Sequence, residues 1–185
     1  MVDKREQIIV AAMVLFIENG VQATPMSAIA KSANTGMGTI YNYFATKEEL
    51  INAIYIYIKQ DEIRTISAPI ENNSIKRQFE HFCRALINYF VNNPLHFRFM
   101  DQFQSSPVIT GATRNEGAAA FASYLALIVQ GQEQGIIKSI GIEEIMQFVM
   151  GGIMGFIRWI LAENKTLTEA LLDNQLRIAW DALKE

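Results

Sequence analysis

The first third of the chain alternates short apolar stripes with polar segments at helical spacing. Residues 4–19 carry apolar side chains at three- and four-residue intervals, which predicts an amphipathic helix that stops at Gly20. A second short stripe follows, and we expect Thr24 to cap that helix with Pro25 at its first position. Asn34 stands where the chain must then reverse, and asparagine tolerates the left-handed backbone that such turns often need.

The next predicted helix, residues 36–44, has an inner and an outer edge. Ile40 and Phe44 lie one turn apart and can anchor this helix to a core. The opposite edge carries small and polar residues, namely Gly38, Thr39 and Asn42 with Tyr41 and Tyr43 on its flanks. Such an edge offers hydrogen-bonding groups and close backbone approach to base pairs and phosphates. The pattern is typical of a helix-turn-helix that places its second helix in a major groove of DNA.

The segment from Ile8 to Leu50 resembles the DNA-binding domain of TetR-family transcriptional regulators. The matching stretches are IVAAMVLFIENG, MSAIAKSAN and GTIYNYFATKEEL. The last stretch places the most specific residues at the spacing of that family, namely Gly38, Thr39, Tyr41, Phe44, Lys47 and Leu50. Three positions depart from the family pattern: Asn34 replaces a usual glycine, Gly36 a common serine cap, and Met37 a polar or basic residue. The resemblance implies a homodimer that binds a double-stranded DNA operator and responds to a small-molecule effector.

The residues expected to contact DNA come from the two short helices and the start of the next one. They are Ser27, Met37, Gly38, Thr39, Tyr41, Asn42, Tyr43 and Lys47. Lys47 begins the flanking helix, so we expect its ammonium on a phosphate, the alternative being a solvated surface charge. The formal net charge of −3 gives no support for DNA binding through bulk charge. Placement of Lys31 and Lys47, together with helix N-termini, is expected to supply the local positive potential.

In the rest of the chain, apolar residues recur at helical spacing, and no strand pattern is present. The sequence Thr46-Lys47-Glu48-Glu49 is a capping-box pattern, in which Glu49 is expected to reach back to the Thr46 backbone, and it starts a helix that runs to about Arg64. Further helices are predicted at residues 74–92, 94–103, 112–134, 142–163 and 167–184. We therefore predict an all-α fold of about nine helices. A helix-turn-helix domain is expected at residues 1–50, and a helical ligand-binding and dimerisation domain at residues 51–185.

The last two predicted helices are the most apolar part of the chain. Residues 145–161 are the one membrane candidate, but Gln147 and Arg158 interrupt a run that barely reaches the roughly 17–25 residues of a spanning helix. Gly151 and Gly155 lie one turn apart and can let another helix approach closely. We predict a homodimer through the last two helices, no membrane association and a cytoplasmic location.

Aromatic side chains are concentrated in the second predicted domain, where they form either a plain core or the lining of an apolar effector site. The core is the first expectation for any single phenylalanine. Candidates for the lining are Phe82, Leu86, Tyr89, Phe103, Phe121, Tyr124, Phe148 and Trp159, with Gln102 or Asn88 to orient a polar group. The TetR resemblance raises the expectation of a pocket but assigns no residue to it.

Catalytic or metal chemistry finds little support in the sequence. His81 and His96 are the two histidines, and neither stands in a metal-binding spacing; no glycine-rich phosphate loop is present. Cys83 cannot form an intramolecular disulfide and lies on an apolar stripe, so we expect a buried thiol in a reducing compartment.

We predict a ligand-responsive transcriptional regulator without cofactor or metal, a repressor released from its operator by a small apolar or amphipathic molecule. One alternative is a small-molecule binding module with a degenerate helix-turn-helix, which the weak basicity and Met37 favour. An all-helical enzyme is the other, and it lacks an assembled nucleophile or metal site.

Overall fold

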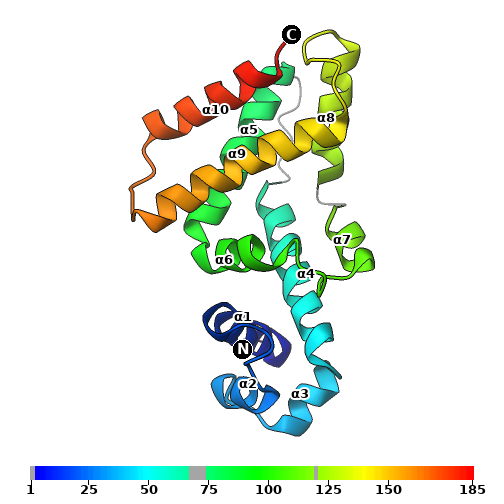
Figure 1. Cartoon of the computed structure of the whole chain (residues 1–185), viewed down its shortest axis with the longest axis vertical. Helices are drawn as coiled ribbons and strands as arrows, with labels where there is room; N and C mark the ends of the chain where they lie inside the picture. Colours follow the sequence, from blue (N-terminus) through cyan, green and yellow to red (C-terminus); the bar gives the residue numbers. More distant parts are fainter. Residues whose placement is uncertain (1–2, 67–73, 119–120) are drawn as a thin grey trace. The chain divides into compact units, whose positions relative to one another are not determined.

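The computed structural model describes residues 3–66, 74–118 and 121–185, and these residues form an all-helical structure (Figure 1). Its helices are α1 (Lys4–Asn19), α2 (Met26–Ser32), α3 (Met37–Tyr43), α4 (Lys47–Ile66), α5 (Ile75–Asn92), α6 (Pro94–Phe103), α7 (Gly111–Ala118), α8 (Ala122–Glu133), α9 (Ile142–Ala162) and α10 (Glu169–Leu183). The other regular pairing in the described residues is one isolated antiparallel bridge between Ile137 and Lys184. The predicted all-α class is confirmed.

One predicted helix is wrong in its extent. The sequence pattern over residues 112–134 predicts a single long helix, whereas the structure has α7 and α8 there as separate helices. These two helices belong to different compact units of the chain. Packing in different units therefore separates two helices that the sequence pattern joins.

The chain forms two compact units, one made of residues 1–61 and 95–118 and the other of residues 62–94 and 119–185. The division falls inside α4, between Asp61 and Glu62. Helices α6 and α7 consequently pack with the N-terminal helices, although they follow α5 in sequence. The predicted boundary between domains at residues 1–50 and 51–185 also falls within α4, and that division remains a prediction.

In the first unit, α1 packs against α2 and α2 against α3, and their apolar stripes form the core (Figure 1). Fully buried members of this core are Ile8, Ile9, Ala12, Met13, Phe16, Ile29, Ile40, Leu50, Ile51 and Ile54. Gly20 ends α1 with a φ of 78°, a backbone conformation that favours glycine. The predicted stop at this residue is confirmed.

The start of α2 differs from the sequence prediction. Pro25 is the cap residue and α2 begins at Met26, without a side-chain hydrogen bond at the cap. Thr24 is buried, and its hydroxyl donates toward the carbonyl oxygens of Leu15 at 3.2 Å and Gly20 at 2.8 Å. The prediction of Thr24 as an N-cap is therefore wrong, because this side chain satisfies carbonyl groups at the C-terminal end of α1 instead.

Residues 95–118 are fixed to α4 by polar and steric contacts. The amide of Asn52 donates to the Val108 carbonyl at 2.8 Å and accepts from the Thr110 backbone N–H at 2.9 Å. Ile109 lies between these two residues and is fully buried. The side chain of Asn52 thus substitutes for a backbone partner, so that a non-helical segment packs on a helix without unpaired polar groups at these two positions.

In the second unit, α5 packs against α8, α9 and α10 (Figure 1). The ring of Phe79 lies 6.1 Å from that of Tyr124 and 5.6 Å from that of Trp180, measured between centroids. At the surface, the Arg84 guanidinium pairs with the carboxylates of Glu169 and Asp173, which joins α5 to α10.

Gly117 provides a test of how tightly α7 packs on α4. A Cβ at this position would lie 2.6 Å from Cε1 of the buried Tyr55 ring and 3.1 Å from Cγ of Lys59. We expect Gly117→Ala to lower the free energy of unfolding by about 1–2 kcal/mol, because overpacking outweighs the gain in helix propensity. Thermal and urea unfolding measure this change.

Gly111→Ala is the matched control, since a Cβ at the first residue of the same helix would meet no atom within 4 Å. That variant should be as stable as the wild type or slightly more stable. Equal unfolding free energies for the two variants would contradict the packing described for α7.

Candidate nucleic-acid interface

The structure divides α3 into a buried and an exposed edge. Ile40 and Phe44 are buried, as the sequence pattern predicts. On the other edge Gly38 and Asn42 are exposed, and Thr39 is half-buried. The flanking side chains Met37, Tyr41 and Tyr43 are 37%, 50% and 41% exposed. A short helix therefore turns small, polar and aromatic groups toward solvent while two apolar side chains hold it to the core.

The turn between α2 and α3 is closed by backbone hydrogen bonds. Asn34 has a φ of 48°, so the predicted left-handed residue is confirmed. The Thr35 N–H donates to the Ala30 carbonyl at 3.0 Å, and the Asn34 N–H donates to the Lys31 carbonyl at 3.2 Å. Gly36 caps α3 without a side-chain hydrogen bond. The angle between the two helices is thus set by the backbone and one strained residue.

The beginning of α4 contains the predicted capping box in a modified form. The Thr46 hydroxyl accepts from the Glu49 N–H at 3.0 Å, as expected. The Glu49 carboxylate accepts from the N–H of Ala45 at 2.8 Å, one residue earlier than the Thr46 N–H of the prediction. The reciprocal bonds still fix the chain between α3 and α4.

Lys47 has a partner that the sequence did not indicate. Its ammonium donates to the Val21 carbonyl at 2.9 Å and lies 3.5 Å from the Gln22 carbonyl. The side chain is half-buried and ties α4 to the loop between α1 and α2. An ammonium has three donors, so a phosphate contact is compatible with this position. No sequence signal joins residues 26 positions apart, which is why this tie was missed.

Other basic side chains of the first unit lie in different environments. The Arg5 guanidinium lies 5.4 Å from the centre of the Phe44 ring, and the Lys4 ammonium donates to the Gln7 side chain at 2.8 Å. Lys31 on α2 is exposed, as is Ser27 near the start of that helix. Arg5 therefore covers the ring that anchors α3, while Lys31 and Ser27 remain accessible.

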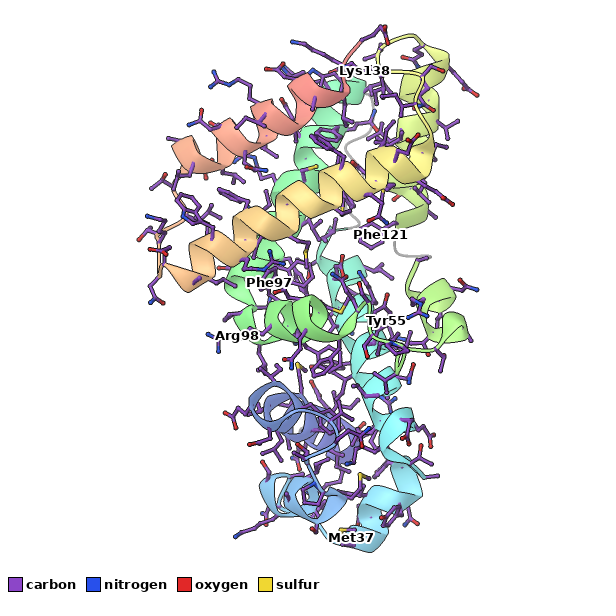
Figure 2. All side chains as sticks on the ribbon, viewed as in Figure 1. Met37, Tyr55, Phe97, Arg98, Phe121 and Lys138 are labelled. Carbon is purple, nitrogen blue, oxygen red and sulfur yellow. The ribbon has the colours of Figure 1, made fainter. Side chains whose placement is uncertain are left out.

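The second unit brings together part of the predicted effector site. The Phe82 ring stacks on the Tyr124 ring at 4.2 Å and meets the Phe121 ring edge-on at 5.8 Å (Figure 2 labels Phe121). Leu86 and Tyr89 are buried in the same unit. The cluster therefore joins α5 to α8 through aromatic contacts.

Tyr124 presents the one buried side-chain polar atom without a hydrogen-bond partner in the part of the chain that the structure describes. The thiol of Cys83, buried as predicted, is its weakly polar neighbour. Burial raises the pKa of both groups far above their ordinary values, and the charge of Glu80 adds to the rise at Cys83. Both groups are accordingly neutral, and the Cys83 thiol is the polar group beside this hydroxyl.

The remaining candidates for the effector site lie elsewhere. Gln102 and Phe103 belong to the first unit, where Gln102 is exposed and the Phe103 ring packs 5.0 Å from that of Phe99. Phe148 and Trp159 on α9 are 61% and 44% exposed. The Trp159 ring is approached by the Lys165 ammonium at 4.8 Å. These exposed aromatic side chains do not join the cluster around Tyr124.

A short exposed helix, fixed by a closed turn to two supporting helices, defines a DNA-binding protein of the helix-turn-helix class. Residues 8–54 match the family model described as bacterial regulatory proteins, tetR family, and residues 74–184 match the model of the tetracyclin repressor-like C-terminal domain. The chain belongs to the TetR family of transcriptional regulators. The described residues contain no group of three His, Cys, Asp or Glu side chains that could hold a metal ion.

Known regulators resemble the chain over most or part of its length. An uncharacterized HTH-type transcriptional regulator of Bacillus subtilis, YhgD, is 29% identical over 157 residues, which cover 80% of this chain and 79% of that protein. The HTH-type transcriptional regulator UidR of Escherichia coli is 39% identical over 113 residues, 60% of this chain and 58% of UidR. A TetR-family regulator from Shewanella sp. PV-4 has the same fold, with a TM-score of 0.91, 23% identity and 99% of each chain covered.

A substitution at Gly38 tests whether the exposed edge of α3 binds DNA, because stability and DNA affinity are expected to change differently. A Cβ at this position would meet no atom within 4 Å, so the fold itself does not require glycine there. We expect Gly38→Ala to keep or raise the free energy of unfolding, by about 0.5 kcal/mol, because alanine favours helix. The same change should weaken DNA binding about tenfold, or about 1.4 kcal/mol, because the added methyl group holds α3 away from the duplex.

Fluorescence anisotropy with operator DNA and thermal unfolding measure the two effects on Gly38→Ala. Gly111→Ala, which adds a methyl group outside the helix-turn-helix, should change neither property much. Wild-type DNA affinity in Gly38→Ala would show that α3 does not approach DNA through this edge.

Proposed function

We propose that the protein is a homodimeric repressor that binds a near-palindromic operator through α3 and is released by a small apolar or amphipathic effector. The observation that carries the proposal is the outer edge of α3, where Gly38, Thr39 and Asn42 are accessible above two buried anchors. Two such helices of a dimer would enter successive major grooves, about 34–36 Å apart. A dimer seated there would block access of other proteins to the same DNA.

The phosphate contacts of this complex are proposed to be few. Ser27 and Lys31 on α2, the tyrosines of α3 and Lys47 are suitable in type and exposure. Asp3 accompanies Lys4 and Arg5 at the start of the chain, and the net charge is −3. Because each neutralised phosphate contributes to the salt dependence of binding, we expect a shallow dependence on salt.

The dimer interface is proposed to lie on α9 and α10. Helix α9 is long and apolar enough to cross a membrane by length and composition, yet only 28% of its most apolar window is buried within the chain. Phe148, Trp159 and Ile178 are among the most exposed large apolar side chains of the described residues. A face of this kind is stable in water when a second copy covers it.

The glycines of α9 support the same interface. A Cβ at Gly151 or Gly155 would meet no atom within 4 Å, so neighbouring elements of the chain do not explain these residues. Each glycine costs about 0.5–1 kcal/mol of helix stability relative to alanine. Close approach of a helix from a second copy gives a reason for both, and it assigns Phe148 and Trp159 to the interface in preference to the effector site.

The effector is proposed to bind at the cluster of Phe82, Phe121 and Tyr124. Aromatic rings supply apolar contact area, and the unpartnered Tyr124 hydroxyl supplies one polar group to orient a ligand. Helix α4 contributes residues 47–61 to one compact unit and its last residues to the other. It is therefore the proposed carrier of the signal, which is limited to the difference in effector affinity between the two states.

A titration with DNA separates this function from a binding module whose helix-turn-helix is degenerate. Fluorescently labelled duplex from the promoter region beside the protein's own gene should bind the full-length dimer with a Kd in the range of about 10⁻⁸ M or tighter at physiological salt. A scrambled duplex of equal length is the control. Equal, weak binding to both duplexes would favour the degenerate module.

The proposed interface predicts the effect of a charge on α9. Phe148→Asp should convert the dimer to a monomer at micromolar concentration, because a carboxylate would be buried against an apolar helix. Sedimentation equilibrium measures the mass. Ala126→Asp, at an exposed position of α8, is the matched control and should remain dimeric. A dimeric Phe148→Asp variant would place the interface elsewhere.

A further inference from the structure

We infer that α3 recognises A·T base pairs, with Asn42 on an adenine and Met37 on the methyl group of a thymine. This inference rests on the proposed function, since it specifies which bases the exposed edge of α3 prefers. It concerns the sequence class of the operator, which the fold of the chain does not determine.

Helix α3 has no charged side chains. Residues 37–43 contain no arginine, lysine, aspartate or glutamate. Arginine or lysine on the O6 and N7 atoms of guanine is the most frequent specific contact in the major groove, and aspartate or glutamate accepts from cytosine N4. Neither contact is available from this helix, so it has no charged side chain with which to prefer a G·C pair.

Asn42 presents an accessible side-chain amide on α3. This residue is exposed on the edge opposite Ile40 and Phe44, and its side chain makes no hydrogen bond to the described residues of the chain. An asparagine amide can donate to N7 and accept from N6 of adenine at the same time. Thr39 lies beside it, and its hydroxyl can bond to more than one base. Asn42 is thus the residue of α3 best suited to discriminate between bases.

Met37 is the first residue of α3. It lies between Gly36 and Gly38, which have no side chains of their own. Figure 2 shows Met37 at the rim of the first unit, and its side chain is 37% exposed. N-terminal residues of recognition helices contact base edges, and the thymine C5 methyl is the apolar group available there.

The experiment begins with selection of duplexes from a randomised pool by the full-length protein. The selected half-site should contain A·T pairs at the positions that α3 contacts. Each thymine in these positions is then replaced by deoxyuridine, which lacks only the C5 methyl group. For one thymine per half-site, the replacement should weaken binding of the wild type about fourfold, the effect of losing one methyl group from an apolar contact.

The Met37→Ala variant identifies the side chain that contacts this methyl group. It should bind the thymine duplex more weakly than the wild type does, and deoxyuridine should cause no further loss. Asn42→Ala should reduce the preference for adenine at one position by about fivefold to 150-fold, the range of a bidentate contact. Asn115→Ala, at an exposed position of α7, is the control, and thermal unfolding verifies that all variants are folded.

The outcomes distinguish this inference from the proposed function. Selection of half-sites dominated by G·C pairs, or equal deoxyuridine losses in the wild type and Met37→Ala, would overturn the inference while leaving DNA binding intact. Failure to enrich any sequence would overturn the proposed function, and the inference with it.

Discussion

The burial of Ile40 and Phe44 is the interaction on which the DNA-binding unit depends. A helix of seven residues is far too short to be stable alone in water, so α3 exists because these two side chains are held in the core. The closed turn at Asn34 and the capping bonds at Thr46 fix its two ends. The exposed edge of α3 is therefore presented by contacts that lie on the opposite side of the helix.

The same unit contains a part of the chain that follows α5. Residues 95–118 pack against α4 through the paired bonds of Asn52 and the close approach of Gly117 to Tyr55. The packing boundary after residue 61 falls within α4, as does the predicted domain boundary after residue 50. Because α4 contributes to both compact units, a change in the packing of residues 95–118 would act on the helix that follows α3 directly. The last residues of α4 belong to the unit that contains the proposed effector site, so α4 is the proposed route of the effector response.

The spacing of apolar residues was sufficient to predict most of the helices. It failed where contacts between residues far apart in sequence determine the structure. The stripes of α1 and α5 and the left-handed Asn34 follow from neighbouring residues, which is why sequence patterns locate them. The separation of α7 from α8 depends on which unit each helix joins, and no local signal contains that information. The inner and outer edges of α3 were predictable for the same reason as the helices. Thr24 bonds to Leu15, 9 residues away, as well as to Gly20, and Lys47 bonds to Val21, 26 residues away, so local periodicity did not predict the structural roles of Thr24 and Lys47.

The glycines in the helices fall into two groups, those packed against other parts of the chain and those on exposed surfaces. At Gly117 and Gly131, neighbouring side chains of the same chain would collide with a Cβ, and the fold alone accounts for the residue. A Cβ at Gly38, Gly151 or Gly155 would meet no neighbouring atom of the described chain within 4 Å, although each glycine weakens its helix. We propose that another molecule approaches the helix backbone closely at these three positions. On α3 that molecule is proposed to be DNA and on α9 a second copy of the chain, so the two surfaces that define the regulator share one sequence signature.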